Sequence, residues 1–196
     1  GRLLDESDLG NLTRNTIYAI SDGISNFGGF FEDATLPTGV TFPINRANLN
    51  NNSTSFANGG VSSPAPNSIG WFLDLPDGFL VNVDMATNAG LVAVVANKPT
   101  SAICSDASTT NGISRIYAFS FGRGESAINI LAGYTEANVL AKHIVFYKNI
   151  SSGSNNVPAE LVITDENGNF IPRPPLKDLS ALKFKLLNWR DLPTAD

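Results

Sequence analysis

The sequence contains a single cysteine and a single histidine. One cysteine excludes a disulfide bond within these 196 residues and any zinc site built from several cysteine ligands. No apolar run approaches the ~20 residues that a membrane-spanning helix needs. The sequence therefore predicts no disulfide-stapled fold, no cysteine-rich zinc module and no membrane span.

Basic residues are few as well. Lys and Arg total 13 against 18 Asp and Glu, so the net charge is −5. A nucleic-acid surface needs clustered Lys and Arg to neutralise phosphates. Near the C-terminus Asp178 and Asp191 interrupt the one concentration of basic residues: Arg173, Lys177, Lys183, Lys185 and Arg190. We expect a solvated face there and no nucleic-acid partner. The acidity and the many Asn, Ser, Thr and Gly residues favour a secreted or cell-surface protein.

A hydrophobic content of 42% is enough for a packed core. The stretch 69–122 holds most of the signal for architecture. Short runs rich in aromatic and β-branched residues alternate there with Pro, Gly, Asn and Asp, which predicts consecutive antiparallel strands. These strands are expected at 69–76, 79–84, 90–96 and 114–122. The chain is thus predicted to be all-β.

Further strands are expected on both sides of that stretch, at 15–23, 127–131, 143–148, 159–164, 169–171 and 182–190. The segment 136–147 is compatible with a helix as well, since Leu140, Ile144 and Tyr147 fall on one helical face, but a strand is favoured at 143–148. Asn167-Gly168 predicts a hairpin turn, since both residues tolerate positive φ. The region 24–68 is predicted to be a long loop-rich insertion with an exposed Asn-rich tract at 48–55. Ile-Tyr-Ala-x-Ser occurs at 17–21 and again at 116–120. The offset fits about two propeller blades of ~40–50 residues, or one blade with a large insertion.

Candidate chemical groups are sparse, and each has a structural interpretation that is favoured. Asp165-x-Asn-Gly-Asn resembles part of a calcium loop, but its glycine comes too early for an EF-hand and a hairpin turn is the better account. A Ser-His-Asp hydrolase triad that used His143 would need a serine on a Gly-x-Ser-x-Gly elbow, and the sequence contains no such motif. Cys104, beside Asp106, has no evident base partner. We predict no catalytic residue and no metal ligand among them.

Paired carboxylates can catalyse glycoside hydrolysis across a cleft. Asp74 and Asp77 form one such pair in sequence, and the acidic group Asp5, Glu6 and Asp8 is another; both are interpreted as turn residues. The tip 122–125 is interpreted as a hairpin turn rather than a phosphate loop. Asn-x-Ser/Thr triplets begin at Asn11, Asn51, Asn52 and Asn149, and they are expected by chance in so Asn-rich a chain.

Several segments, taken in order, resemble the C-terminal domain of the PilY/PilC-type proteins of type IV pili. Segment 1–22 carries Gly-Arg-Leu-Leu, Ser-Asp-Leu and Tyr-Ala-Ile-Ser-Asp, and segment 70–76 reads Gly-Trp-Phe-Leu-Asp-Leu-Pro. Segment 90–119 is similar to a strand, a cysteine-bearing loop and the next strand of that family. Segment 188–192, Asn-Trp-Arg-Asp-Leu, resembles the end of those chains. The segments cover under half of the sequence.

The resemblance implies a quinoprotein-like β-propeller that acts without enzymatic activity at the pilus tip, in assembly, adhesion and twitching motility. Residues 1–196 would then be a single all-β domain or an excised fragment, the last two to four blades of a larger propeller. Its partners would be pilins or minor pilins, upstream blades and host or surface receptors. The family's calcium loop and N-terminal adhesive domain have no match here, so no cofactor is expected within this segment and calcium would bind upstream.

Two other functions stay open. One is a secreted propeller enzyme or a sugar-binding lectin, for which Trp71 and Asp74 are the residues to check in a central channel. The other is a subunit of a different extracellular filament, held by strand addition along an exposed sheet edge.

Overall fold

The structure is a computed structural model in which each strand is defined by its pairing partners. It describes the following residues, to which every structural statement below refers: 6–10, 12–20, 41, 43–53, 69–88, 91–100, 112–120, 124–130, 132–147 and 160–176.

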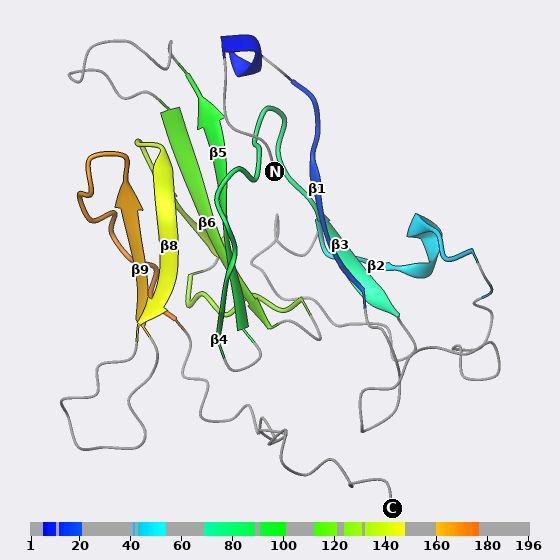
Figure 1. Ribbon diagram of the computed structural model, residues 1–196. Coiled ribbons are helices and arrows are strands. Elements are labelled where there is room, and N and C mark those ends of the chain that lie inside the picture. Colours follow the sequence, from blue (N-terminus) through cyan, green and yellow to red (C-terminus); the bar gives the residue numbers. More distant parts are fainter. Residues whose placement is uncertain are drawn as a thin grey trace, which may run out of the picture.

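The described strands form three sheets (Figure 1). The first has the order β1-β3-β2, with β1 at Thr16–Ile20, β3 at Gly70–Asp74 and β2 at Asn50–Asn51. The second is β4-β5-β6-β7, made of Ala86–Asn88, Leu91–Pro99, Gly112–Ser120 and Tyr134–Ala137. The third pairs β8, Ala141–Tyr147, with β9, Glu160–Asp165. The 3-10 turns η1, Glu6–Asp8, and η3, Arg46–Asn48, complete the described elements.

Every described pairing is antiparallel except that of β2 with β3. The all-β prediction is therefore confirmed. None of the three sheets closes on itself through the described strands. The four-stranded second sheet matches the expected strand number of a blade, whereas the other two sheets contain three and two described strands.

The second sheet lies between the other two, as Figure 1 shows with β5 and β6 in the centre. Successive side chains of a strand point to opposite faces. In β6, Tyr117 and Phe119 point toward the first sheet, and Ile116 and Ala118 point toward the third. Strand β5 is also buried on both faces, and its sequence is therefore a nearly continuous apolar run.

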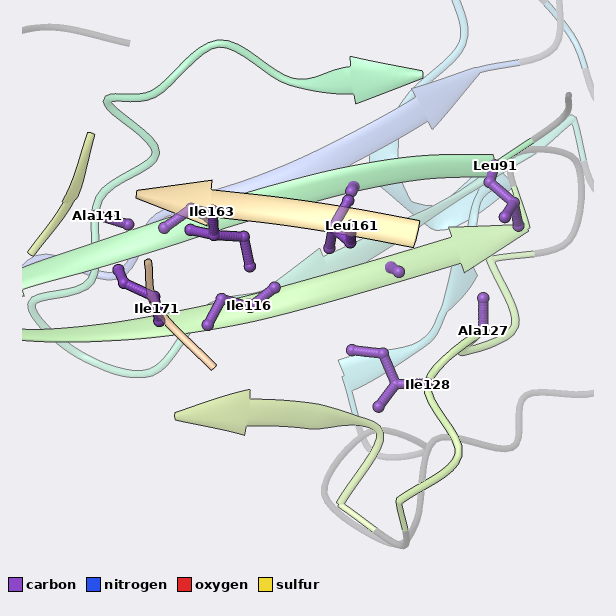
Figure 2. Packing of buried hydrophobic residues seen from close by; sticks show 11 residues of the cluster. Leu91, Ile116, Ala127, Ile128, Ala141, Leu161, Ile163 and Ile171 are labelled. Carbon is purple, nitrogen blue, oxygen red and sulfur yellow. The ribbon is translucent and has the colours of Figure 1, made fainter. Parts of the chain in front are cut away.

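Two interfaces therefore flank the middle sheet. The aromatic interface, toward the first sheet, has a buried cluster of Trp71, Leu73, Leu75, Phe79, Val92, Val94, Ala96, Tyr117 and Phe119. The aliphatic interface, toward β8 and β9, contains Leu91, Ala93, Val95, Ile116, Ala118, Ala127, Ile128, Ala141, Leu161, Ile163 and Ile171 (Figure 2).

The strands predicted at 15–23, 90–96, 114–122, 143–148 and 159–164 are confirmed as β1, β5, β6, β8 and β9, with shifted ends. The predicted strand 69–76 is β3, but it pairs with β1 and β2 instead of with its successors. The stretch 69–122 is therefore divided between two sheets, and the prediction of one consecutive antiparallel series was wrong at that point.

The strand predicted at 79–84 was also wrong. Leu80 makes one antiparallel bridge to Asn97, with both backbone hydrogen bonds 2.8 Å long, and pairing then stops. Val81 packs at the aromatic interface and Val83 at the aliphatic one. The alternation that predicted a strand thus belongs to a segment that crosses the sheet edge, and the true strand is β4.

The segment 127–131 was predicted as a strand, but the described part of it makes only an isolated bridge, from Ile128 to Leu176. Its apolar character is explained by burial of Ala127 and Ile128 in the core. The Asn-rich tract is exposed only in part, since Asn52 is fully buried and its backbone N–H donates to the carbonyl of Phe72. The predicted return strand 169–171 is reduced to a bridge between Thr164 and Phe170.

Several predictions fall outside the described residues. These are the strand at 182–190, the segment 188–192, Cys104 with Asp106, Asp5, and the triplets at Asn11 and Asn149.

Candidate functional site

Asp165 ends β9 and organises the turn that follows it. Its carboxylate accepts hydrogen bonds from the backbone N–H of Asn167 and of Asn169, both 2.8 Å, and from the Asn169 side chain at 3.0 Å. Burial acts to raise the pKa of Asp165, but these hydrogen bonds outweigh it and the pKa is lowered. Gly168 has φ 78°, as the turn requires. The hairpin interpretation is confirmed, and the carboxylate is occupied by its own turn.

Asp74 meets a partner that the sequence did not suggest. Arg46 of η3 places Nη2 2.6 Å from both carboxylate oxygens, and Thr16 donates to one of them at 2.7 Å. The same guanidinium lies 3.9 Å from the centre of the Phe72 ring and donates to Tyr18 Oη at 3.0 Å. Burial acts to raise the pKa of Asp74, but the Arg46 and Thr16 hydrogen bonds and the Arg46 charge lower it overall. This Arg46 clamp fastens part of the insertion onto the first sheet.

Asp77 has a different partner, Arg14, at 3.1 Å. Asp74 and Asp77 are thus held by separate arginines. Asp77 lies in a turn, as predicted, but the turn interpretation of Asp74 was wrong, because Asp74 ends strand β3 and pairs with Thr16. Trp71, the other residue proposed for a central channel, is buried against Phe119 with ring centres 5.1 Å apart. Neither of the two channel candidates is an open polar group.

Arg115 forms a second clamp at the edge of the aromatic interface. Its guanidinium carbon lies 4.8 Å from the Phe79 ring centre and 4.5 Å from that of Tyr134, and Nε donates to Glu136 at 2.8 Å. Behind it, burial raises the pKa of Tyr117 to about 12. The phenol of Tyr117 is consequently neutral at physiological pH and serves packing.

A buried polar network joins the middle sheet to β8. Asn97, fully buried on β5, donates through Nδ2 to Asn82 Oδ1 and to the carbonyl of Ala141, both at 2.8 Å. The Ser114 hydroxyl lies 2.5 Å from both Asn97 Oδ1 and the Val139 carbonyl, and it accepts from the Ala141 N–H at 2.8 Å. These bonds fix the start of β8 against β5 and β6.

A cleft opens beside this network. We call it the β8 cleft; its volume is about 620 Å³, and it is lined by Asn82, Val83, Asp84, Asn97, Leu140, Ala141, Lys142, His143, Ile144 and Glu166. His143 was considered alone in the sequence; here it is one of several polar residues around a hollow. The others come from separate segments, so no local motif could have revealed them.

The outer face of β8 and β9 is apolar in its middle. Val145 and Tyr147 are each 53% exposed on β8, and Phe170 beside β9 is 80% exposed. Val145 lies directly opposite Val162 in the β8–β9 register. We call Val145, Tyr147, Val162 and Phe170 the outer patch. Contiguous exposed apolar side chains of this kind mark interaction surfaces.

The glycan acceptor positions and the tip 122–125 can be placed only in part. The side chain of Asn52 donates to the carbonyl of Gly124 at 3.3 Å, and Asn51 Oδ1 accepts from the Ser53 N–H. Gly124 has φ 66°, and a Cβ there would lie 2.2 Å from Asn52 Nδ2. Gly124 is therefore packed against the insertion, and Asn52 is enclosed.

Within the described residues no group of three or more His, Cys, Asp or Glu side chains is arranged to hold a metal ion. No helix in the same part of the chain is long and apolar enough to cross a membrane. Fold and site together define an all-β protein of stacked sheets. No protein-family model, curated protein or solved structure matches the chain.

Proposed function

We propose that this chain is part of a quinoprotein-like β-propeller in a non-enzymatic component of type IV pili. It acts in pilus assembly, adhesion and twitching motility, at the pilus tip on the outer surface of a bacterial cell. Residues 1–196 correspond in this proposal to the last two to four blades, as a single domain or as a fragment. The proposed family rests on the resemblance of segments 1–22, 70–76 and 90–119 to the PilY/PilC-type proteins.

One observation carries the proposal: a four-stranded antiparallel sheet lies face to face between two other sheets, with both of its faces buried. Propeller blades are four-stranded antiparallel sheets that pack against their neighbours around an axis. A two-layer sandwich would leave one face of each sheet in solvent. The middle sheet is therefore what a blade with two neighbours should resemble.

The outer patch supports the proposal that partners pack against this chain. In a propeller the face that carries Val145 and Tyr147 would be covered by another blade, here an upstream one, since exposed apolar side chains are stabilised by burial at roughly 25 cal/mol per Å². Pilins or minor pilins and surface receptors are the further partners in the proposal. Calcium, in the same proposal, binds upstream of this segment.

The contacts of the aspartate carboxylates also support a structural role for the chain. Asp74, Asp77 and Asp165 each hold a clamp, an ion pair or a turn within the fold. Groups committed to such contacts are poorly placed to act as a general acid or base on a substrate.

The test is recovery of the protein with pilins. The full native protein, tagged, should co-purify with pilins from cell-surface fractions of its own bacterium. Val145→Asp should reduce pilin recovery if the outer patch is covered in the working assembly. Met85→Asp is the matched control, because Met85 is 59% exposed outside the patch. Recovery of another filament protein in place of pilins would favour the filament-subunit alternative, and a cytosolic location with no filament protein would refute the proposal.

A further inference from the structure

The β8 cleft lies at the junction of the middle and third sheets. Its lining includes Asn82 and Asp84 from the segment that precedes β4, and Lys142 and His143 from the start of β8. The turn residue Glu166 also lines it. At about 620 Å³ the hollow falls within the range of small-molecule sites, ~300–1,000 Å³.

Four of the polar side chains around this hollow, those of Asn82, Asp84, Lys142 and His143, keep hydrogen-bonding groups that no described residue occupies. Asn82 accepts from the buried Asn97 amide, which fixes the orientation of its side chain and leaves its own Nδ2 without a partner among the described residues. The same part of the chain offers no hydrogen-bond or ion-pair partner to the side chains of Asp84, Lys142 or His143. The hollow thus presents an amide donor, a carboxylate, an ammonium and an imidazole.

A β-bulge explains why two neighbouring residues serve one site. In a regular strand Lys142 and His143 would point to opposite faces. The register of β8 with β9 shifts between Ala141 and His143, and such an irregularity re-aims side chains. Both residues therefore line the cleft. The Ala141 end of the bulge is held by the Asn97–Ser114 network, so the cleft wall is rigid.

Apolar side chains make up the rest of the lining: Val83, Leu140, Ala141 and Ile144. A lining that combines apolar side chains with hydrogen-bonding groups suits a pyranose ring, whose C–H faces are apolar and whose hydroxyls point outward. The Lys142 ammonium adds a preference for one negative charge, since a charge-assisted hydrogen bond is about twice as strong as a neutral one, and the adjacent His143 imidazole adds a further hydrogen-bonding group. Asp84 and Glu166 oppose a polyanion at the same place.

We propose that the β8 cleft binds a carbohydrate that carries a carboxylate, such as a uronic acid unit of a surface polysaccharide. Lys142 and His143 contact the carboxylate, Asn82 and Asp84 bond the hydroxyls, and the ring lies on Leu140 and Ile144. The inference does not depend on the pilus assignment, because it uses only the geometry of the cleft.

The experiment is an NMR titration of the isotope-labelled 196-residue chain with D-galacturonic acid and, in parallel, with neutral D-galactose. The lack of aromatic residues in the cleft lining predicts weak binding of the acid, with Kd of about 1 mM. Chemical-shift changes should concentrate at Lys142, His143 and the Asn82 side chain. Galactose should bind at least about five-fold more weakly, the order expected for losing one exposed charge contact.

Lys142→Gln is the decisive variant and should weaken binding of the acid by about five-fold. Lys98→Gln is its control, because it removes the same charge from a lysine whose ammonium contacts the Asp77 carbonyl, outside the cleft lining. Unchanged circular dichroism would show that both variants fold. Shifts located elsewhere, equal binding of the two sugars, or equal effects of the two variants would each overturn the proposal, as would no binding of the acid at 20-fold above the expected Kd.

Discussion

The two interfaces of the middle sheet are built on the same two strands, yet one is packed with aromatic side chains and the other with aliphatic ones. Toward the first sheet, β6 presents Tyr117 and Phe119, and the rings of Trp71 and Tyr134 extend the cluster to its edge. Toward the third sheet the contacts are aliphatic and end in the buried Asn97–Ser114 network. Large rings fill the space between sheets with few residues, whereas small aliphatic side chains bring β8 close enough to β5 for side-chain-to-backbone hydrogen bonds.

Because of this difference, different kinds of substitution should destabilise the two interfaces. The aromatic interface should be sensitive to loss of volume, and the aliphatic interface to loss of hydrogen bonding. Substitutions of comparable burial on the two sides can separate these causes, and the four below run from the largest expected effect to the smallest.

Phe119→Ala should lower the free energy of unfolding by about 4 kcal/mol, because it leaves a cavity and removes ring contacts with Trp71 and Tyr117. Ile116→Ala, equally buried on the aliphatic side, should cost about 3 kcal/mol. Urea unfolding followed by circular dichroism measures both. A larger cost for Ile116→Ala would show that the rings contribute no more than the aliphatic packing does.

Asn97→Ala should cost about 2–3 kcal/mol, although it removes little volume, since it strips partners from buried polar groups at Ser114 and Ala141. The same unfolding measurement applies. Asn88→Ala on β4 is the control and should change stability by less than about 0.5 kcal/mol, because Asn88 is only half-buried and makes no described side-chain hydrogen bond. Equal costs would mean that the network does not tie the third sheet to the second.

Gly124→Ala should cost about 2 kcal/mol through two effects, a positive φ of 66° and a Cβ 2.6 Å from the Trp71 ring. Gly168→Ala shares the positive φ, 78°, but has nothing within 4 Å, so its cost should be about 1 kcal/mol. The difference in urea midpoints between the two variants isolates the crowding of the added Cβ against the Asn52 side chain and the Trp71 ring. Identical midpoints would mean that backbone conformation alone matters at Gly124.

The Arg46 clamp should give the smallest effect, and one that depends on pH. The pKa of Asp74 is lowered in the folded state, so its contribution to stability is present above the unfolded pKa of about 4 and is lost as pH falls through the lower folded value. Arg46→Gln should therefore lower the urea midpoint at pH 7 and leave it nearly unchanged near pH 2. Arg14→Gln, at the exposed pair with Asp77, should have no measurable effect at either pH. A pH-independent loss for Arg46→Gln would assign the clamp to packing on Phe72 instead of charge.

The sequence predicted the paired strands better than the crossings between them. Strands β5, β6, β8 and β9 were found because β-branched and aromatic runs bounded by turn residues are a local signal. The segment 79–84 carries the same signal, yet Val81 and Val83 are buried at different interfaces while the chain passes the sheet edge. Only the positions of both neighbouring sheets distinguish that case from a strand.

The contacts that build the candidate sites are long-range, which is why the sequence did not reveal them. Arg46 lies 28 residues from Asp74, within an insertion that offered no reason to pair the two. The β8 cleft joins Asn82, Lys142 and Glu166, which no single motif spans. By contrast the turn at Asp165 was predicted correctly, because its hydrogen bonds close within four residues.

The central position of β5 and β6 should determine the order in which the sheets unfold. Each of these strands has a hydrogen-bonded neighbour on both sides and is buried on both faces, whereas the described pairing of β8 and β9 is limited to each other. Backbone amides of β5 and β6 can exchange with solvent deuterium only when the whole stack comes apart, while those of the β8–β9 hairpin need only that hairpin to detach. The slowest-exchanging amides should thus trace two central strands, and the last structure to be lost on unfolding would be the middle sheet that the other two enclose.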